Sequence, residues 1–184
     1  MSLAPISKEK YRVLIAKMCE QAKARVVVEI GVYAGALSHL LAETSTLEHL
    51  WIVDPWIWEG KFTPGHMDGI AHKVQKWADS KLNVTVLRMG SLAAVEEFDD
   101  SSIDFIHIDQ RHGHETIKSD IRAWWPKLRI GGTISGDNYE HPPLASGVDE
   151  LVPERELSGG GKLRGVDAWR IWSAVKTEEK TFAT

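Results

Sequence analysis

The sequence predicts an α/β fold in which helices cover both faces of a doubly wound, mostly parallel sheet. Strand-like and helix-like segments alternate along the chain, and strands joined through helices pair in parallel by right-handed crossovers. Residues 25–30 (RVVVEI) form a continuous β-branched run, which is typical of a strand buried on both faces of such a sheet. The 184 residues are 43% hydrophobic and 26% charged, which fits a single domain over residues 1–184 and excludes a disordered chain.

The individual elements follow from hydrophobic spacing and from turn residues. Val13, Leu14 and Met18 recur at helical spacing, so we expect the chain to begin with an amphipathic helix. The expected helices cover residues 11–24, 36–43, 70–79, 92–98, 114–128 and 147–152, and the expected strands cover residues 25–30, 50–53, 84–87, 103–108, 131–135 and 169–175. The chain then divides into an N-terminal helical segment (1–24), a core (25–176) and a polar tail (177–184).

Composition and charge argue against several classes of partner. Lys and Arg number 22 against 26 Asp and Glu, a formal charge of −4, so there is no basic excess for binding nucleic acid. No apolar stretch approaches the roughly 18–20 residues that a membrane span needs, and the polar residues 1–10 do not resemble a signal peptide. A single cysteine, Cys19, cannot build a disulfide framework. We therefore expect a cytoplasmic protein that acts on a small molecule, with no nucleic acid or membrane partner; a homodimer is compatible with this.

A glycine turn follows the first strand, in the segment EIGVYAG (residues 29–35). Glycines there let the main chain approach a ligand, and the next helix offers unpaired N–H groups. The dinucleotide-binding pattern G-x-G-x-x-G needs a glycine where Tyr33 stands, and Glu29 would repel phosphate groups. A carboxylate at this strand end suits a cationic group instead. Glu29, Gly31 and Gly35 follow the acid-x-Gly-x-x-x-Gly pattern of S-adenosylmethionine (SAM) methyltransferases, whose cofactor carries a sulfonium and an ammonium.

Two further strand ends carry polar residues that suit a nucleoside. Asp54 ends the second strand, 25 residues after Glu29, where acidic residues accept hydrogen bonds from ribose hydroxyls. Gly90 and Ser91 follow the third strand, and a serine there can reach an adenine edge. Simpler interpretations exist, because Asp-Pro is a common turn and Ser91 can cap the helix that follows.

Two neighbouring strand ends carry acidic residues. Asp109 ends the fourth strand and Asp137-Asn138 end the fifth, so adjacent parallel strands would bring three oxygen-bearing side chains together. Two carboxylates and an amide, completed by water, suit a hard divalent cation such as Mg²⁺. The alternatives are a helix cap at Asp109 and an Asx turn at residues 137–138.

Several histidines surround Asp109. The string of His107, His112 and His114 is one pattern of a metal-dependent hydrolase. His107, however, lies inside an apolar strand, as a structural histidine does, and His114 leads into a helix. His112, three residues after Asp109, is placed to act as a general base at the rim of the pocket.

Together these motifs resemble the metal-dependent class I SAM O-methyltransferases, of which catechol O-methyltransferase is a familiar member. The likeness covers residues 26–175, and the family's first motif, acid-Leu-Gly-Ala-Tyr-Cys-Gly, is similar to residues 29–35. The resemblance implies a Rossmann-like fold with an antiparallel last strand, and it assigns roles to the residues above. The cofactor-binding positions so implied are Glu29, Gly31, Tyr33, Gly35, Ser38, Asp54, Gly90, Ser91 and Asp109; the metal ligands are Asp109, Asp137 and Asn138; the catalytic base is His112.

The chain departs from catechol O-methyltransferase at two positions. That enzyme has a lysine three residues after its first metal aspartate, whereas this chain has His112. In this respect the chain resembles the antibiotic-sugar O-methyltransferases, in which a histidine fills the base position. Ser38 is displaced by one position from the family's serine for the methionine carboxylate. Residues 107–115, with Asp120 and Trp124 downstream, also resemble a group of small bacterial SAM methyltransferases.

The chain contains eight tryptophans, two of which follow Asp54 closely. Trp56 lies two residues past the ribose acid, from where its ring can stack on adenine. Trp58 with Phe62 and His66 can form a lid over the methyl acceptor, and ordinary loop packing is the alternative for both tryptophans. His141 is a further candidate for the acceptor pocket.

We therefore expect a SAM-dependent methyltransferase that uses Mg²⁺ or another divalent cation to methylate a hydroxyl of a small molecule, either a sugar or a catechol-like diol. One alternative is a non-catalytic SAM-binding protein, which would tolerate the loss of Asp109, Asp137 and His112. The other is the metal-dependent hydrolase that uses the histidine cluster. A nicotinamide enzyme is disfavoured by Glu29 and Tyr33, which oppose phosphate binding.

Overall fold

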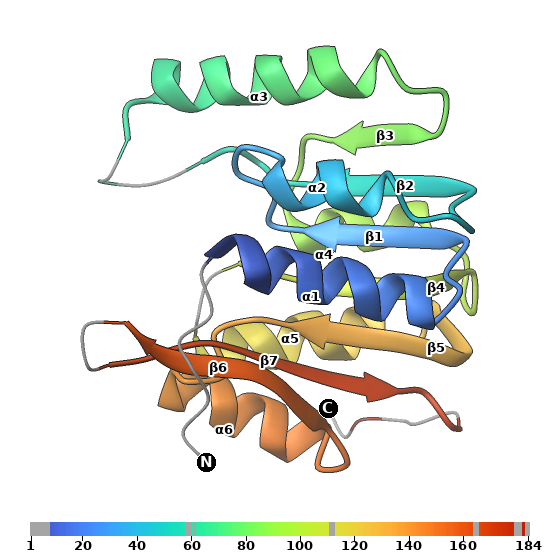
Figure 1. Ribbon diagram of the computed structural model, residues 1–184, viewed down its shortest axis with the longest axis vertical. Coiled ribbons are helices and arrows are strands. Elements are labelled where there is room, and N and C mark those ends of the chain that lie inside the picture. The colour runs from blue at the N-terminus through green and yellow to red at the C-terminus, as the bar shows by residue number, and fades with distance from the viewer. Residues whose placement is uncertain are drawn as a thin grey trace.

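One seven-stranded sheet organises the chain, in the order β3-β2-β1-β4-β5-β7-β6 (Figure 1). The computed structural model describes residues 8–57, 60, 62–110, 113–163, 166–178 and 182, with only the backbone for residues 8, 161–163 and 166–169. The strands are β1 (Val26–Ile30), β2 (His49–Val53), β3 (Val84–Leu87), β4 (Ile103–Ile108), β5 (Leu128–Gly136), β6 (Glu156–Leu163) and β7 (Val166–Val175). Strands β1 to β5 pair in parallel, whereas β7 runs antiparallel to both β5 and β6. The predicted doubly wound, mostly parallel fold with an antiparallel last strand is confirmed.

Helices cover both faces of this sheet (Figure 1). One face carries α1 (Lys8–Gln21), α2 (Ala36–Leu41) and α3 (Pro64–Ala78); the other carries α4 (Ser91–Ala94), the 3-10 helix η1 (Val95–Glu97), α5 (His114–Trp124) and α6 (Pro142–Leu151). On the first face, Ile15 and Leu41 are fully buried in one apolar cluster with Phe105 of β4. On the second face, Ile121 and Trp124 are buried with strand residues such as Ile106. Because both faces are covered, the central strands are mostly apolar, as residues 25–30 predicted.

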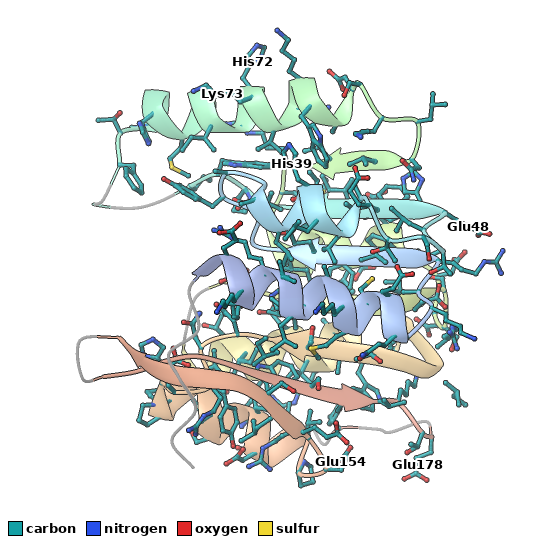
Figure 2. The ribbon with its side chains drawn as sticks, in the orientation of Figure 1. His39, Glu48, His72, Lys73, Glu154 and Glu178 are labelled. Atoms are coloured by element: carbon teal, nitrogen blue, oxygen red, sulfur yellow. The ribbon has the colours of Figure 1, made fainter. Side chains whose placement is uncertain are left out.

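An aromatic contact joins α2 and α3 on the first face of the sheet. The His39 ring of α2 stacks on Trp77 of α3, with ring centroids 4.1 Å apart. His39 lies between the two helices in Figure 2, whereas His72 and Lys73 project from the outer side of α3. The outer side of α3 is therefore polar, and its inner side packs toward α2 and the sheet.

The helices bear on two expectations from the sequence, the lack of a membrane span and the inert character of Cys19. None of the helices within the described residues combines the length and the apolar character needed to cross a bilayer. Cys19 is a free thiol, fully buried on α1, and burial raises its pKa to about 12. Such a thiol is unreactive at neutral pH.

The structure corrects several predicted boundaries. α3 begins six residues before the predicted start at residue 70, because the Thr63 hydroxyl accepts a hydrogen bond from the His66 N–H and Pro64 suits the first turn of a helix. The helix expected over residues 92–98 divides into α4 and η1. The helix expected to reach residue 128 ends at Trp124, so that β5 already begins at Leu128.

Among the elements that the described residues form, only strand β6 has no counterpart in the prediction. Its sequence, ELSGGGKL, is polar and glycine-rich, which indicates a loop when it is considered alone. It forms a strand because β7 supplies a hydrogen-bonding partner in an antiparallel pair at the edge of the sheet. Local composition was overridden by a partner that the sequence pattern did not reveal.

The carboxyl ends of the parallel strands meet at one edge of the sheet, on the left in Figure 1, where α1 also begins. Three non-glycine residues there have positive φ angles, which residues with a side chain rarely adopt. They are Tyr33 (φ 49°) after β1, Trp56 (φ 51°) after β2 and Asn138 (φ 55°) after β5. Backbone conformations of this kind persist where surrounding contacts impose them, and they gather at functional sites.

Gly31 has a structural reason that the sequence did not reveal. Its φ angle is +89°, and a Cβ atom at this position would lie 1.8 Å from the carbonyl oxygen of Asp109. The glycine is therefore required because the turn after β1 packs directly on the end of β4. Close approach to a ligand, which the glycine turn suggested, is not needed to explain it.

This packing predicts a large stability loss for Gly31→Ala, about 2–4 kcal/mol or more, because the methyl group meets main chain that cannot move aside. Urea unfolding monitored by circular dichroism measures the loss. The matched control is Gly69→Ala in α3, where a Cβ would meet no atom within 4 Å. An alanine in that helix interior should raise stability by about 0.5–1 kcal/mol. Equal effects of the two substitutions would contradict the packing argument.

Candidate active site

Glu29 is a buried carboxyl group at the end of β1. It is 2% exposed, and its Oε2 accepts a hydrogen bond of 2.5 Å from the Ser38 hydroxyl of α2. Burial raises the pKa of Glu29 from its usual 4.5 to about 8; the Ser38 hydrogen bond and the charge of Arg12 lower it, and the charges of Asp109 and Asp54 raise it. A nearby positive charge stabilises the ionised form of such a buried carboxyl group. Ser38, which the resemblance assigned to the cofactor, holds Glu29 in place.

Asp54, at the end of β2, binds the glycine turn. Its Oδ2 accepts hydrogen bonds from the main-chain N–H groups of Val32 and Tyr33, both at 2.9 Å, and its Oδ1 accepts one of 2.6 Å from the Trp56 N–H. Asp54 is 5% exposed. These bonds use most of the acceptor capacity of the carboxylate. The predicted ribose-binding acid therefore also fixes the backbone of the turn beside it.

Trp56 is a packing residue in this structure. It is 2% exposed, belongs to the apolar cluster that includes Met67, and its indole N–H donates a hydrogen bond of 2.8 Å to the Tyr33 carbonyl oxygen. The expected stacking on adenine needs an open ring face, which this buried ring lacks. The structure corrects that expectation: Trp56 supports the turn between β1 and α2.

A cavity of about 470 Å³ opens between α4 and α5, beside the end of β3. Its lining includes Gly90, Ser91, Gln110 and Asp120. The Ser91 hydroxyl donates a hydrogen bond of 2.6 Å to Asp120 and accepts one of 2.8 Å from the indole N–H of Trp124. A Cβ at Gly90 would meet no atom within 4 Å, so the glycine leaves open space at the mouth of the cavity.

Asp109 and Asp137 form an acidic pair, as their places at the ends of β4 and β5 predicted. Asp137 is 6% exposed, and its Oδ1 has no hydrogen-bond partner among the described residues. Burial raises the pKa of Asp137 well above its usual range, and the charge of the neighbouring Asp109 raises it further. A hydrogen bond from the Asn138 side chain lowers it, which places that amide beside the pair.

Tyr11 of α1 is a member of this site that the sequence did not indicate. It is 3% exposed, and its hydroxyl has no hydrogen-bond partner other than Asp137 among the described residues. Burial raises its pKa, and so do the negative charges of Asp137 and Asp109 and the hydrogen bond with Asp137. The Tyr11 hydroxyl and Asp137 are therefore close to one another, and Asp137 Oδ1 is a buried oxygen without a partner among the described residues. Buried polar groups are normally satisfied, so this cluster is suited to receive a ligand.

The oxygen atoms of this cluster suit a divalent cation. Two carboxyl groups that repel one another, with an unpartnered oxygen and an adjacent amide, match the ligands of a hard cation. No three side chains of His, Cys, Asp or Glu gather as a metal site within the part of the chain that the structure describes. Asp109, Asp137 and Asn138 would supply three ligand residues, and water would complete the shell.

Among the described residues, the two histidines of the predicted cluster, His107 and His114, do not converge on a common site. His107 is fully buried in β4, its Nδ1 lies 2.9 Å from the Ser135 hydroxyl, and burial lowers its pKa to about 3. His114 begins α5 and pairs at the surface with Glu115 and Glu150. His112, the predicted base, lies outside the described residues. The hydrolase alternative, which needs the three histidines to converge, is not supported by His107 and His114.

An aromatic row lies at the mouth of the glycine turn. Tyr33, 37% exposed, stacks on Phe62 at 6.1 Å between ring centroids, and Phe62 stacks on His66 at 4.8 Å. Phe62 and His66 thus lie together as the predicted lid requires, whereas Trp58 lies outside the described residues. His141 is exposed at the start of α6, next to Pro142.

Three residues at this edge were not singled out for a role by the sequence: Tyr11, Gln110 and Asp120. Tyr11 lies far from the other site residues in sequence, on a helix whose pattern indicated only packing. Asp120 was part of the resemblance, and a charged residue at a helix position that should face the sheet was the available signal. Gln110 directly follows Asp109, and it carried no signal of its own.

The fold and this arrangement of strand-end residues define a class I methyltransferase type of α/β domain. A family model described as "Methyltransferase domain" matches residues 28–139, more than half of the chain. The chain belongs to this methyltransferase family.

Three solved structures illustrate the likeness of the fold. An O-methyltransferase from Bacillus cereus, in complex with SAH, is 18% identical with a TM-score of 0.64, and the match covers 93% of this chain and 82% of that one. The O-methyltransferase TomG from Streptomyces achromogenes, in complex with SAM, is 15% identical with a TM-score of 0.65 (93% and 81%). Spermidine synthase from Thermotoga maritima is 13% identical with a TM-score of 0.64 (92% and 60%). The fold is therefore shared with enzymes of a different reaction, and the family match decides for a methyltransferase.

A curated relative of this chain is an uncharacterized protein, y4gI, of Sinorhizobium fredii. It is 28% identical over 110 residues, which cover 56% of this chain. The match spans only 12% of that protein's length.

The raised pKa of Glu29 predicts how stability depends on pH. Its folded pKa of about 8 lies above the usual 4.5, so its stabilising contribution is complete below about pH 4.5 and is lost as the pH rises toward 8. Glu29→Gln removes this loss. The variant should gain stability over the native chain as the pH rises from 5 to 8, by roughly 2–4 kcal/mol.

Urea unfolding at pH 5, 6.5 and 8 measures this difference. Glu96→Gln, at an exposed position of η1, is the control and should follow the pH dependence of the native chain. Parallel curves for Glu29→Gln and the native chain would show that burial does not raise the pKa of Glu29.

Proposed function

We propose that the chain is a SAM-dependent O-methyltransferase that methylates a hydroxyl of a small diol, a sugar or a catechol, with the help of a divalent cation. The observation that carries the proposal is the pairing of two features at one sheet edge. Glu29 is a buried carboxyl suited to a cationic ligand, and Asp109 with Asp137 forms an acidic pair with an unpartnered oxygen. A non-catalytic SAM-binding protein would need only the first feature.

The cofactor would extend along the carboxyl edge of the sheet. The cavity beside Gly90 and Ser91 has room for the adenine, and Asp54 at the end of β2 is hydrogen-bonded to the turn that follows Glu29. At the other end, Glu29 would face the cationic part of SAM, which supplies a methyl group bonded to a positively charged sulfur. SAM and SAH in TomG and in the Bacillus cereus enzyme support this choice of cofactor.

The acceptor would be held at the acidic pair. Asp109, Asp137 and Asn138 would hold a divalent cation, which supplies positive charge that lowers the pKa of a nearby hydroxyl. A vicinal diol presents two oxygens at a suitable spacing for such a site. Tyr11, whose hydroxyl lies beside Asp137, would be within reach of an acceptor oxygen held there.

Methyl transfer then requires little beyond correct positioning. His112 would take the hydroxyl proton, the acceptor oxygen would form a bond to the methyl carbon, and the bond from that carbon to sulfur would break. The negative oxygen and the positive sulfonium neutralise one another as the products form, so exclusion of water and in-line alignment assist the step. The row of Tyr33, Phe62 and His66 at the mouth of the turn is placed to cover the reactants.

Binding and turnover test the proposal with one variant. The native chain should bind S-adenosylhomocysteine in calorimetry and should transfer a labelled methyl group from SAM to catechol or to a 6-deoxyhexose. EDTA should abolish transfer, and Mg²⁺ should restore it. Asp137→Asn should retain S-adenosylhomocysteine binding within a few-fold and should lose transfer by at least about 100-fold. Binding without transfer to any diol would favour the non-catalytic alternative, and no binding at all would overturn the proposal.

The Asp137→Asn substitution, which should lower methyl transfer, should raise the stability of the protein. Because burial and the charge of Asp109 raise the pKa of Asp137, replacing its carboxyl by a neutral amide should stabilise the metal-free chain by about 1–2 kcal/mol at pH 8. Asp99→Asn, at an exposed position, should change stability by less than about 0.5 kcal/mol. A destabilised Asp137→Asn variant would show that the acidic pair contributes to stability, contrary to our interpretation.

The role of His112 as base predicts that His112→Ala lowers kcat by about 100- to 10,000-fold and leaves S-adenosylhomocysteine affinity unchanged. His112→Lys should recover part of the rate, mainly at high pH where a lysine loses its proton. His114→Ala, at the surface pair with Glu115 and Glu150, is the control and should retain the native rate. Full activity of His112→Ala would remove the base assignment alone.

A further inference from the structure

Arg12 is a cation at an edge of the sheet where the strand ends are acidic. It lies in the second turn of α1, which begins at the carboxyl edge (Figure 1), and its side chain is partly exposed. The neighbouring residue, Tyr11, lies beside Asp137. Arg12 makes no hydrogen bond and no ion pair with any residue that the structure describes. Its N–H donors are thus available to a ligand that carries a negative group.

Arg12 and Glu29 are near one another without forming a pair. Burial raises the pKa of Glu29 to about 8, and the positive charge of Arg12 is one of the influences that lower it. The two side chains therefore lie within range of each other's charge, although their charged atoms are too far apart for an ion pair. A negative and a positive group in this relation suit a zwitterion, which carries both charges on one small unit.

The amino-acid end of SAM is a unit of this kind. Its ammonium and its carboxylate are bonded to the same carbon atom, so a site that offers Glu29 to the ammonium must also hold a carboxylate close by. The acidic side chains at the neighbouring strand ends, Asp54, Asp109 and Asp137, would repel that carboxylate. A cation beside Glu29 offsets this repulsion.

Ser38, to which the resemblance assigns this carboxylate, already has a partner. A serine hydroxyl has a single proton, and the fully buried Ser38 donates it to Glu29 at 2.5 Å. Main-chain donors of the glycine turn are in use as well, because the Val32 and Tyr33 N–H groups both donate to Asp54. The carboxylate of the cofactor therefore needs a donor from another element.

We propose that Arg12 binds the carboxylate of the cofactor's amino-acid part, in place of the serine that the resemblance implies, and so makes the chain select cofactors that carry this group. A guanidinium can donate two parallel N–H bonds to the two oxygens of a carboxylate. The inference rests on the proposed function, because it takes SAM as the ligand. It adds a specificity-determining residue on α1, outside residues 28–139 that the family model matches.

The test compares two probes that differ only in the carboxylate, S-adenosylhomocysteine and its decarboxylated analogue 5′-S-(3-aminopropyl)-5′-thioadenosine, by calorimetry. The native chain should prefer S-adenosylhomocysteine by about 10- to 100-fold, the range expected for hydrogen bonds between charged groups. Arg12→Met removes the positive charge and keeps a helix-forming side chain, and it should reduce the preference to less than about threefold. Lys17→Met is the matched control, because it removes a positive charge from an exposed position further along α1; it should preserve the native ratio.

An effect of Arg12 that acts only through Glu29 gives a different result. Its charge favours the ionised form of Glu29, so its loss would weaken both probes, since both carry the ammonium, and would leave their ratio unchanged. A native ratio in Arg12→Met would therefore overturn the inference, and so would equal affinity of the native chain for the two probes. Failure of the native chain to bind either probe would instead overturn the proposed function.

A second variant keeps the test decisive if Arg12→Met does not fold. Arg12→Ala places the strongest helix-forming residue at this position of α1 and should give the same low ratio. Because Arg12 makes no bond to a described residue, either substitution should change stability by less than about 0.5 kcal/mol, which thermal unfolding measures before the ratio is determined. A native ratio in a folded Arg12→Ala variant would likewise overturn the inference.

Discussion

Negative charge at one edge of the sheet is the constraint on which the rest of the structure depends. Because β1, β2, β4 and β5 run in parallel, their carboxyl ends bring Glu29, Asp54, Asp109 and Asp137 to the same edge. Three of these four side chains are at most 6% exposed. Carboxyl groups removed from water must find hydrogen-bond donors or cations, or else take up a proton. The local backbone at this edge follows from how each group meets that requirement.

The carboxyl groups differ in how completely the protein satisfies them, and the difference separates structure from function. Asp54 receives three main-chain N–H groups, so it stabilises the turn that contains Val32 and Tyr33. Glu29 receives one hydroxyl, and its pKa rises to about 8. Asp137 retains an oxygen without a partner among the described residues. A neutral side chain at Glu29 should therefore stabilise the free protein and weaken cofactor binding. A neutral side chain at Asp137 should stabilise it and weaken binding of the cation and the acceptor. Gly31 is needed for packing, so its replacement only destabilises the protein.

The sequence predicted what depends on local pattern and missed what depends on contacts across the fold. Apolar strands and acidic strand ends are local signals, so the sheet, the glycine turn and the meeting of Asp109 with Asp137 were all predicted. Strand β6 was missed because its glycine-rich sequence becomes a strand only through pairing with β7. Tyr11 was missed because a helix early in the chain begins at the carboxyl edge, which no spacing reveals. For Trp56 the sequence left stacking on adenine and loop packing both open, because its burial depends on an apolar cluster shared with distant residues such as Met67.

Charge and directional hydrogen bonds provide different kinds of recognition at the two ends of the proposed cofactor site. Coulomb attraction falls slowly with distance and has no preferred direction, so Glu29 favours any cation that reaches it. Selection of the base needs donors and acceptors in fixed orientations, because a rotatable amide accommodates either pattern. The hydrogen bonds that Asp120 accepts from Ser91 and Gln110 restrict the orientations of these two side chains beside the cavity. Attraction at one end of the proposed site therefore comes from charge, and restriction at the other end comes from directional hydrogen bonds.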